Sequence, residues 1–131
     1  MADEIRILGL ACVLLLAHIF AAIHFKTRQY GVDWNMGARD EAMPPLNPVA
    51  GRLERARDNF LETFPIAIIA LLGVAVSGRA GEMTAIGGWI WLGARAVYLL
   101  VYWAGIPKLR TFVFGVSMAG LVMALWPLLA G

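Results

Sequence analysis

Four apolar runs, each close to the ~20 residues that a membrane-spanning helix needs, restrict the folds open to this chain. They cover residues 5–25, 53–77, 83–103 and 110–129. The runs are continuous and do not alternate apolar with polar residues, which favours helices over a transmembrane barrel. Of the 131 residues, 60% are hydrophobic and 15% are charged, which is unlike soluble domains. We therefore expect an all-α integral membrane protein with one domain over residues 1–131.

The connections between the runs differ in length. Residues 26–50 form a polar connection with several prolines and glycines, which are not expected to continue a helix. Residues 77–82 and 105–110 are short turns, and short turns make consecutive helices antiparallel. The sequence thus predicts a four-helix up-down bundle. Asp3 and Glu4 stand where a signal peptide would carry basic residues, so we expect the first run to be a retained membrane helix.

Basic residues set the expected orientation in the membrane. The first connection, the start of the second run and the third connection hold most of them: Lys26, Arg28, Arg39, Arg52, Arg55, Arg57, Lys108 and Arg110. The opposite side of the membrane would hold Arg6 and Arg79. The long first connection is therefore predicted to be cytoplasmic, with both termini on the other side. The net charge of +2, without a basic tract, gives no reason to expect nucleic-acid binding.

A polar stripe lies on the second run, and its residues are three, four and three positions apart. They are Arg52, Arg55, Asn59 and Glu62. This spacing puts them on one face of a helix. The apolar part of the run, residues 64–76, is too short to cross a bilayer, so charged residues must enter the membrane, where they usually face a bundle interior, a partner or a ligand.

Two interpretations of the polar stripe remain open. Its guanidinium, amide and carboxylate groups suit a small zwitterionic peptide. Alternatively, Arg55, Asp58 and Glu62 could neutralise one another in a structural network. Arg57 lies on another face of the same helix.

The third run has a second stripe, formed by Arg95, Tyr98 and Tyr102. Arg95 lies in the middle of an apolar segment and needs a counter-charge, for which Glu62 and Asp58 on the second run are the candidates. The stripe could serve a ligand, an ion pair between helices, or both.

Other polar and small residues give weaker signals. Arg110 opens the fourth run, where a cation could stabilise a thiolate or simply anchor the helix at the membrane surface. His18 and His24 have no further ligands at suitable spacing, so no metal site is expected. Three glycines of the third run are expected to allow close packing of helices. They are Gly87, Gly88 and Gly93.

The second run resembles the signature of the MAPEG superfamily, the membrane-associated proteins in eicosanoid and glutathione metabolism. That signature reads Arg-Ala-x-x-Asn-x-x-Glu followed closely by proline, and it matches residues 55–65 here. Residues 94–102 are similar to the family's Arg-x-x-Tyr-x-x-x-Tyr pattern, and residues 105–110 resemble its arginine-bearing turn. The first run matches in hydrophobicity alone. The resemblance is to a bacterial-type member.

The resemblance implies homotrimers of four-helix protomers, with glutathione bound between neighbouring subunits near the cytosolic face. By position, the glutathione-binding residues would be Arg55, Asn59, Glu62, Tyr98 and Tyr102, with Arg95 in the polar network and Arg28 as a further candidate. Arg110 matches the arginine that stabilises the glutathione thiolate in the family. Thr63 stands where some eicosanoid-forming members have tyrosine, so their particular lipid substrates are not implied.

Two functions of different class follow from these features. The first is a membrane-bound glutathione transferase or peroxidase that acts on lipophilic substrates. The alternative is a non-catalytic membrane protein that binds lipid or glutathione, as one member of the family does with lipid. A transporter is disfavoured, because the chain has no repeated pair of broken helices.

Overall fold

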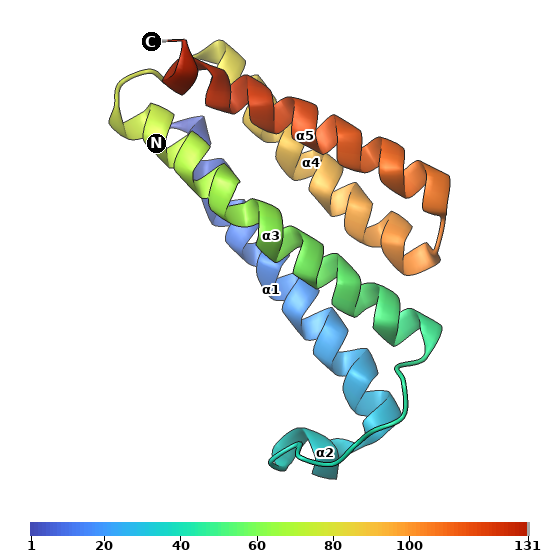
Figure 1. The fold of residues 1–131 in the computed structure, drawn as a ribbon. Coiled ribbons are helices and arrows are strands. Elements are labelled where there is room, and N and C mark those ends of the chain that lie inside the picture. Colours follow the sequence, from blue (N-terminus) through green and yellow to red (C-terminus); the bar gives the residue numbers. More distant parts are fainter. Residues whose placement is uncertain (131) are drawn as a thin grey trace.

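The computed structural model describes residues 1–130, and this part contains five helices and no strand. They are α1 (Asp3–Tyr30), α2 (Val32–Met36), α3 (Pro48–Val76), α4 (Glu82–Ala104) and α5 (Pro107–Leu129). The four long helices run up and down in one bundle, and the N- and C-termini lie at the same end (Figure 1). They have 28, 29, 23 and 23 residues and are apolar enough to cross a membrane. At ~1.5 Å of rise per residue, each exceeds the ~30 Å of hydrocarbon. The all-α, multi-pass membrane architecture is thereby confirmed.

The first connection is shorter than predicted. α1 continues past residue 25 to Tyr30, because the sequence offers no helix breaker before Gly31, whose φ is 100°. α3 already begins at Pro48, where the fixed φ of proline suits the first helical position. The Asn47 side chain caps this end by accepting a hydrogen bond from the Ala50 N–H at 2.9 Å. The prediction that residues 26–50 lack helix is therefore wrong at both ends, and α2 lies between them.

Glycine sets the distance between α4 and α5. A Cβ atom added to Gly87 would lie 2.6 Å from the main-chain oxygen of Gly120, so only glycine allows the two helices to cross this closely. A Cβ on Gly88 would meet the Ile7 side chain at 2.7 Å, which confirms the packing role predicted for both residues. Gly93 has no atom within 4 Å of its Cβ position, so the prediction is wrong there.

α3 and α4 each contact all three of the other long helices. The α1–α3 pair and the α4–α5 pair meet around the aromatic rings of α3 and α4. Phe60 stacks on His18 of α1 with centroids 4.7 Å apart and on Trp91 of α4 at 6.0 Å. These buried rings lie at the level of the polar stripe and pack α3 against α1 and α4.

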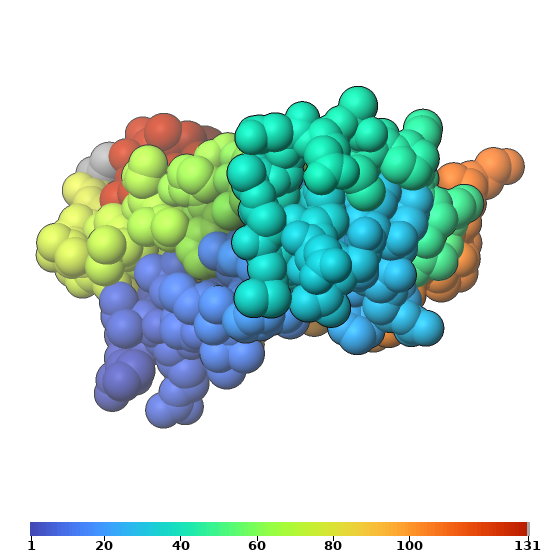
Figure 2. Space-filling model, turned by 90° about the horizontal axis from the view of Figure 1, so that it is seen from below, coloured from blue at the N-terminus to red at the C-terminus, as the bar shows by residue number. Residues whose placement is uncertain are grey.

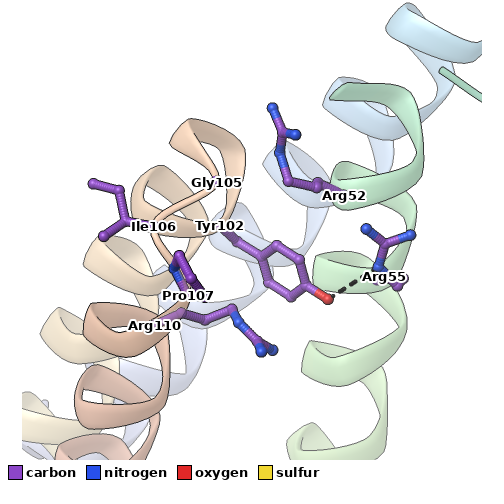
Figure 3. Close-up of a pocket in the computed structure, with 7 residues that line it drawn as sticks. All are labelled: Arg52, Arg55, Tyr102, Gly105, Ile106, Pro107 and Arg110. Carbon is purple, nitrogen blue, oxygen red and sulfur yellow. Dashed lines mark hydrogen bonds between the residues drawn. The ribbon is translucent and has the colours of Figure 1, made fainter. Parts of the chain in front are cut away.

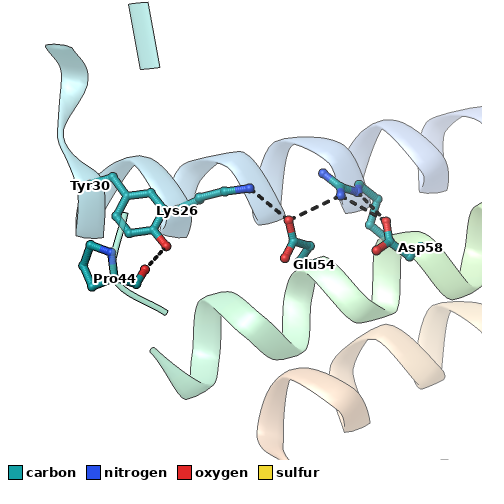
Figure 4. Close-up of polar contacts among 6 residues, drawn as sticks. Lys26, Tyr30, Pro44, Glu54 and Asp58 are labelled. Carbon is teal, nitrogen blue, oxygen red and sulfur yellow. Dashed lines mark hydrogen bonds and ion pairs between the residues drawn. The ribbon is translucent and has the colours of Figure 1, made fainter. Parts of the chain in front are cut away.

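The segment with α2 packs against the end of α1. Gln29 of α1 holds the connection after α2 in place with two hydrogen bonds. Its side-chain N–H donates to the Pro45 carbonyl at 3.0 Å, and its side-chain oxygen accepts from the Asn47 N–H at 2.7 Å. The Tyr30 hydroxyl also donates to the Pro44 carbonyl (Figure 4). Seen from below, this segment covers the end of α1, and the start of α3 lies between it and the turn from α4 to α5 (Figure 2).

Candidate functional site

A cleft opens where α4 turns into α5, opposite the start of α3 (Figure 3). Its volume is about 210 Å³. The lining residues are Arg52, Arg55, Tyr102, Gly105, Ile106, Pro107 and Arg110. Three of these carry a positive charge and none is acidic, so the cleft is suited to an anionic ligand.

The backbone of the α4–α5 turn shapes the cleft. Arg52 of α3 donates from Nε and Nη2 to the Trp103 carbonyl, at 3.2 and 3.1 Å. That carbonyl belongs to the last turn of α4, where helical partners run out. Gly105 ends the helix with a φ of 77°, and a Cβ there would lie 3.2 Å from the Arg52 guanidinium carbon. Arg52 thus fastens the start of α3 to the end of α4.

Tyr102 lies between two arginines from different helices (Figure 3). Its hydroxyl oxygen accepts a hydrogen bond from Arg55 Nε at 3.2 Å. The guanidinium carbon of Arg110 lies 4.8 Å from the centre of the tyrosine ring, a cation–π contact. Because the Tyr102 oxygen already accepts, its O–H proton stays available to a ligand. The Arg55 Nη atoms take part in no hydrogen bond described among residues 1–130, so the cleft presents mainly donors.

Arg95 lies seven residues before Tyr102 on α4, about two helical turns deeper in the bundle, and is completely buried. Its Nη1 donates to the Asn59 side-chain oxygen at 2.8 Å. Three aromatic rings surround the guanidinium carbon, with centroids at 4.3 Å for Tyr98, 5.3 Å for Phe60 and 5.8 Å for Phe114. We call these rings the aromatic cage. Their negative faces partly offset the buried charge.

The predicted ion pair between Arg95 and Glu62 or Asp58 is wrong for this protomer. Asn59, which lies on the face of α3 turned toward Arg95, takes the place of a carboxylate. Asp58 instead accepts from its neighbour Arg57 at 3.0 Å (Figure 4). Glu62 is exposed and is in none of the ion pairs described for residues 1–130.

The remaining acidic residue of this region ties α3 to α1. Glu54 pairs with Lys26 at 2.9 Å and with Arg57 at 3.7 Å (Figure 4). Arg55 is in none of these pairs, so the network of Arg55 with Asp58 and Glu62 is not formed in the described structure. Arg57 lies off the polar stripe, as predicted from its position in the helix.

The sequence-predicted site residues lie in four places. Arg55, Tyr102 and Arg110 meet at the cleft. Asn59, Arg95 and Tyr98 form the layer beneath it, and Glu62 lies further along the exposed side of α3. Arg28 lines a separate cavity between the end of α1 and the start of α3. One protomer therefore brings together only part of the predicted set.

Sequence reasoning missed the contribution of the turn. The backbone of residues 105–107 forms one wall of the cleft, and Arg52 supports that wall. The Gly-x-Pro pattern was the available signal, since glycine ends helices and proline begins them. Within residues 1–130, no group of three or more His, Cys, Asp or Glu side chains is placed to hold a metal ion.

The chain matches a known protein family over almost its whole length. A sequence model described as the MAPEG family matches residues 7–130. The match includes the first helix, where the sequence pattern alone showed only hydrophobicity. No curated protein and no solved structure matches the chain.

Proposed function

This chain belongs to the MAPEG family, and on that premise we propose that it is a membrane-bound glutathione-dependent transferase or peroxidase for lipophilic substrates. Membership is consistent with a role in glutathione or eicosanoid metabolism. The reaction, the thiolate mechanism and the ligand are our proposal. The observation that carries it is the cleft with three arginines and no acidic lining residue.

Glutathione matches the charges of the cleft and the stripe. The tripeptide carries two carboxylates and a thiol that can ionise, and these groups suit the arginines at positions 52, 55 and 110. Its single ammonium group needs an acceptor, which Glu62 supplies. Arg55 and Glu62 are seven positions apart, or about 10 Å of helix rise. An extended tripeptide reaches about the same length, so one molecule can contact both ends of the stripe.

Arg110 is the residue we assign to the thiol. A nearby cation favours the charged form, so the pKa of the bound glutathione thiol would fall and the reactive thiolate would be populated near neutral pH. In conjugation, the thiolate sulfur forms a bond to an electrophilic carbon as the leaving group departs. In peroxide reduction, two glutathione molecules are oxidised to the disulfide while the hydroperoxide becomes an alcohol and water. Either substrate can enter from the bilayer.

A second copy of the chain would complete the site. The cleft, at about 210 Å³, is smaller than the roughly 300–1,000 Å³ of typical small-molecule sites. Arg55 and Glu62 are exposed on the single protomer, although both lie on a helix that can span the membrane. Arg28 lines another cavity of the protomer, so we expect it to contact glutathione from a neighbouring subunit. We therefore propose a homotrimer with the cleft at the cytoplasmic face and both termini on the opposite side.

Calorimetry and thiolate absorbance test this function on detergent-solubilised protein. We expect glutathione to bind and its thiol to titrate below the pH of free glutathione. Arg110→Lys keeps the charge but loses the planar fork, so it should retain part of the shift, whereas Arg110→Ala should retain little. Each pKa unit regained corresponds to about 1.4 kcal/mol of lost thiolate stabilisation. Arg57→Ala, which removes a cation outside the cleft, is the matched control.

Three outcomes separate the possible functions. Turnover of a hydrophobic electrophile or an organic hydroperoxide with glutathione would support the enzyme. Binding of glutathione without turnover of either class would favour the non-catalytic alternative. If the wild type and both Arg110 variants titrate like free glutathione, the thiolate mechanism is wrong.

A further inference from the structure

The hydrogen bond between Arg95 and Asn59 determines which atom of the Asn59 side-chain amide points toward Arg95. Arginine has only donors, so the atom of Asn59 that lies 2.8 Å from Arg95 Nη1 must be its oxygen. The amide NH₂ group then points the other way. It takes part in no hydrogen bond described among residues 1–130, and Asn59 is half-buried on the stripe between Arg55 and Glu62. The group is therefore free to donate to a bound molecule.

Arg95 itself is out of reach of such a molecule. Its relative exposure is 0%, and the aromatic cage of Phe60, Tyr98 and Phe114 encloses the guanidinium group. A side chain packed in this way has little freedom to rotate toward the cleft. Contact with a ligand would require the cage to open, whereas the contact with Asn59 is already made.

We propose that Arg95 is a positioning residue that acts through Asn59 and does not touch glutathione. It holds the amide so that Asn59 can only donate to the ligand. The ligand group beside Asn59 must then be an acceptor, such as a peptide carbonyl or a carboxylate of the tripeptide, and its ammonium group is left to Glu62. This inference rests on the proposed function and changes the role expected for Arg95, from binding residue to support.

A double-mutant cycle tests the positioning role by calorimetry with glutathione. Arg95→Met removes the donor but keeps an unbranched side chain that suits an aromatic environment. The substitution also removes Nε and Nη2, which are buried without a partner among residues 1–130, so we expect the Arg95→Met variant to fold. We expect glutathione affinity to fall about tenfold for Arg95→Met and for Asn59→Ala, each being the loss of one oriented hydrogen bond.

The double variant decides between the mechanisms. If Arg95 acts through Asn59, Arg95→Met should change the affinity by less than about twofold once Asn59 is already alanine. A residue that contacts glutathione, or that only stabilises the fold, would cause the same loss in both backgrounds, and that result would overturn the proposal. Arg57→Met, on another face of α3, is the matched control and should leave affinity unchanged.

Two further results keep the test decisive. If Arg95→Met does not fold, the same cycle is run with Arg95→Lys, which keeps the positive charge and has its N–H donors on a single nitrogen. It should lose a few-fold in affinity with Asn59 present and nothing with Asn59→Ala, and an equal loss in both would count against positioning. If wild-type protein does not bind glutathione, the proposed function fails and this role fails with it. Wild-type binding with an additive cycle overturns the positioning role alone.

Discussion

The crossing of α4 and α5 at Gly87 offers a test of the fold that does not depend on the ligand. In Gly87→Ala, the new methyl group would lie 2.6 Å from the Gly120 oxygen, 2.7 Å from the Met123 Cβ and 3.0 Å from the Ala124 nitrogen. Two of these three neighbours are main-chain atoms, which cannot rotate away. Ordinary van der Waals contact begins near 3.4 Å, so the shortest contact falls short by 0.8 Å.

The helices must separate to accept this methyl group. A radial gap of 0.5–1 Å already forfeits about a quarter to a half of each dispersion contact across an interface. Overpacking of this kind costs about 1–3 kcal/mol in protein cores. We therefore expect Gly87→Ala to lower the free energy of unfolding by that amount, even though alanine favours the helical backbone by up to ~1 kcal/mol over glycine.

Gly93→Ala is the matched control on the same helix. Its Cβ would have no atom within 4 Å, so only the gain in helix propensity remains, and stability should stay unchanged or rise. Unfolding of both variants and wild type can be followed in mixed detergent micelles by titration with sodium dodecyl sulfate, using tryptophan fluorescence. A Gly87→Ala variant as stable as wild type would refute the close crossing. An equal loss for Gly93→Ala would refute the assignment of its face as open.

Three other predictions follow from the stripe and the cleft. Arg52→Ala should lower the free energy of unfolding by about 1 kcal/mol in the same titration, because the last carbonyls of α4 lose a charged donor, and an unchanged value would remove Arg52 as the support of the turn. Glu62→Gln should weaken glutathione binding in calorimetry while Arg57→Ala leaves it intact, and equal losses would show that the stripe is not the site. Native mass spectrometry in mild detergent should detect a trimer, since a lone protomer exposes stripe charges that cost about 2.5 kcal/mol or more each at the bilayer centre, and a dominant monomer would contradict this.

Sequence patterns identified the membrane class and the positions of the four long helices. These features depend on local properties: a run of about 20 apolar residues must be helical in a bilayer, because every main-chain polar group needs a partner within the segment. The ends of α1 and α3 that flank the first connection were predicted wrongly. At Pro48 the capping residues were present in the sequence, but the prolines and glycines of residues 26–50 were interpreted as a loop throughout.

The stripes were also visible in the sequence, because residues three and four apart share a face of a helix. The spacing of residues 52 to 62 and of residues 95 to 102 sufficed to select Arg55 and Tyr102, whereas Arg110 was selected as the cation that opens the fourth run and from the family resemblance. The fold brings all three to one cleft. Periodicity gives the face of each helix. It does not give the rotation of one helix against the next.

Only the tertiary structure decided the partner of Arg95. Electrostatic reasoning on the sequence favoured a carboxylate, but the rotation of α3 against α4 presents Asn59 and Phe60 to the guanidinium group. The other two rings are Tyr98 of α4 itself and Phe114 of α5. That rotation depends on packing between elements distant in sequence, including the contacts of Phe60 and Phe64 on α3 with Trp91 on α4. The same packing separates Arg28 from the cleft in one protomer. The spacing of residues along one helix determines which side chains share a face, and the packing between helices determines which partners those side chains contact.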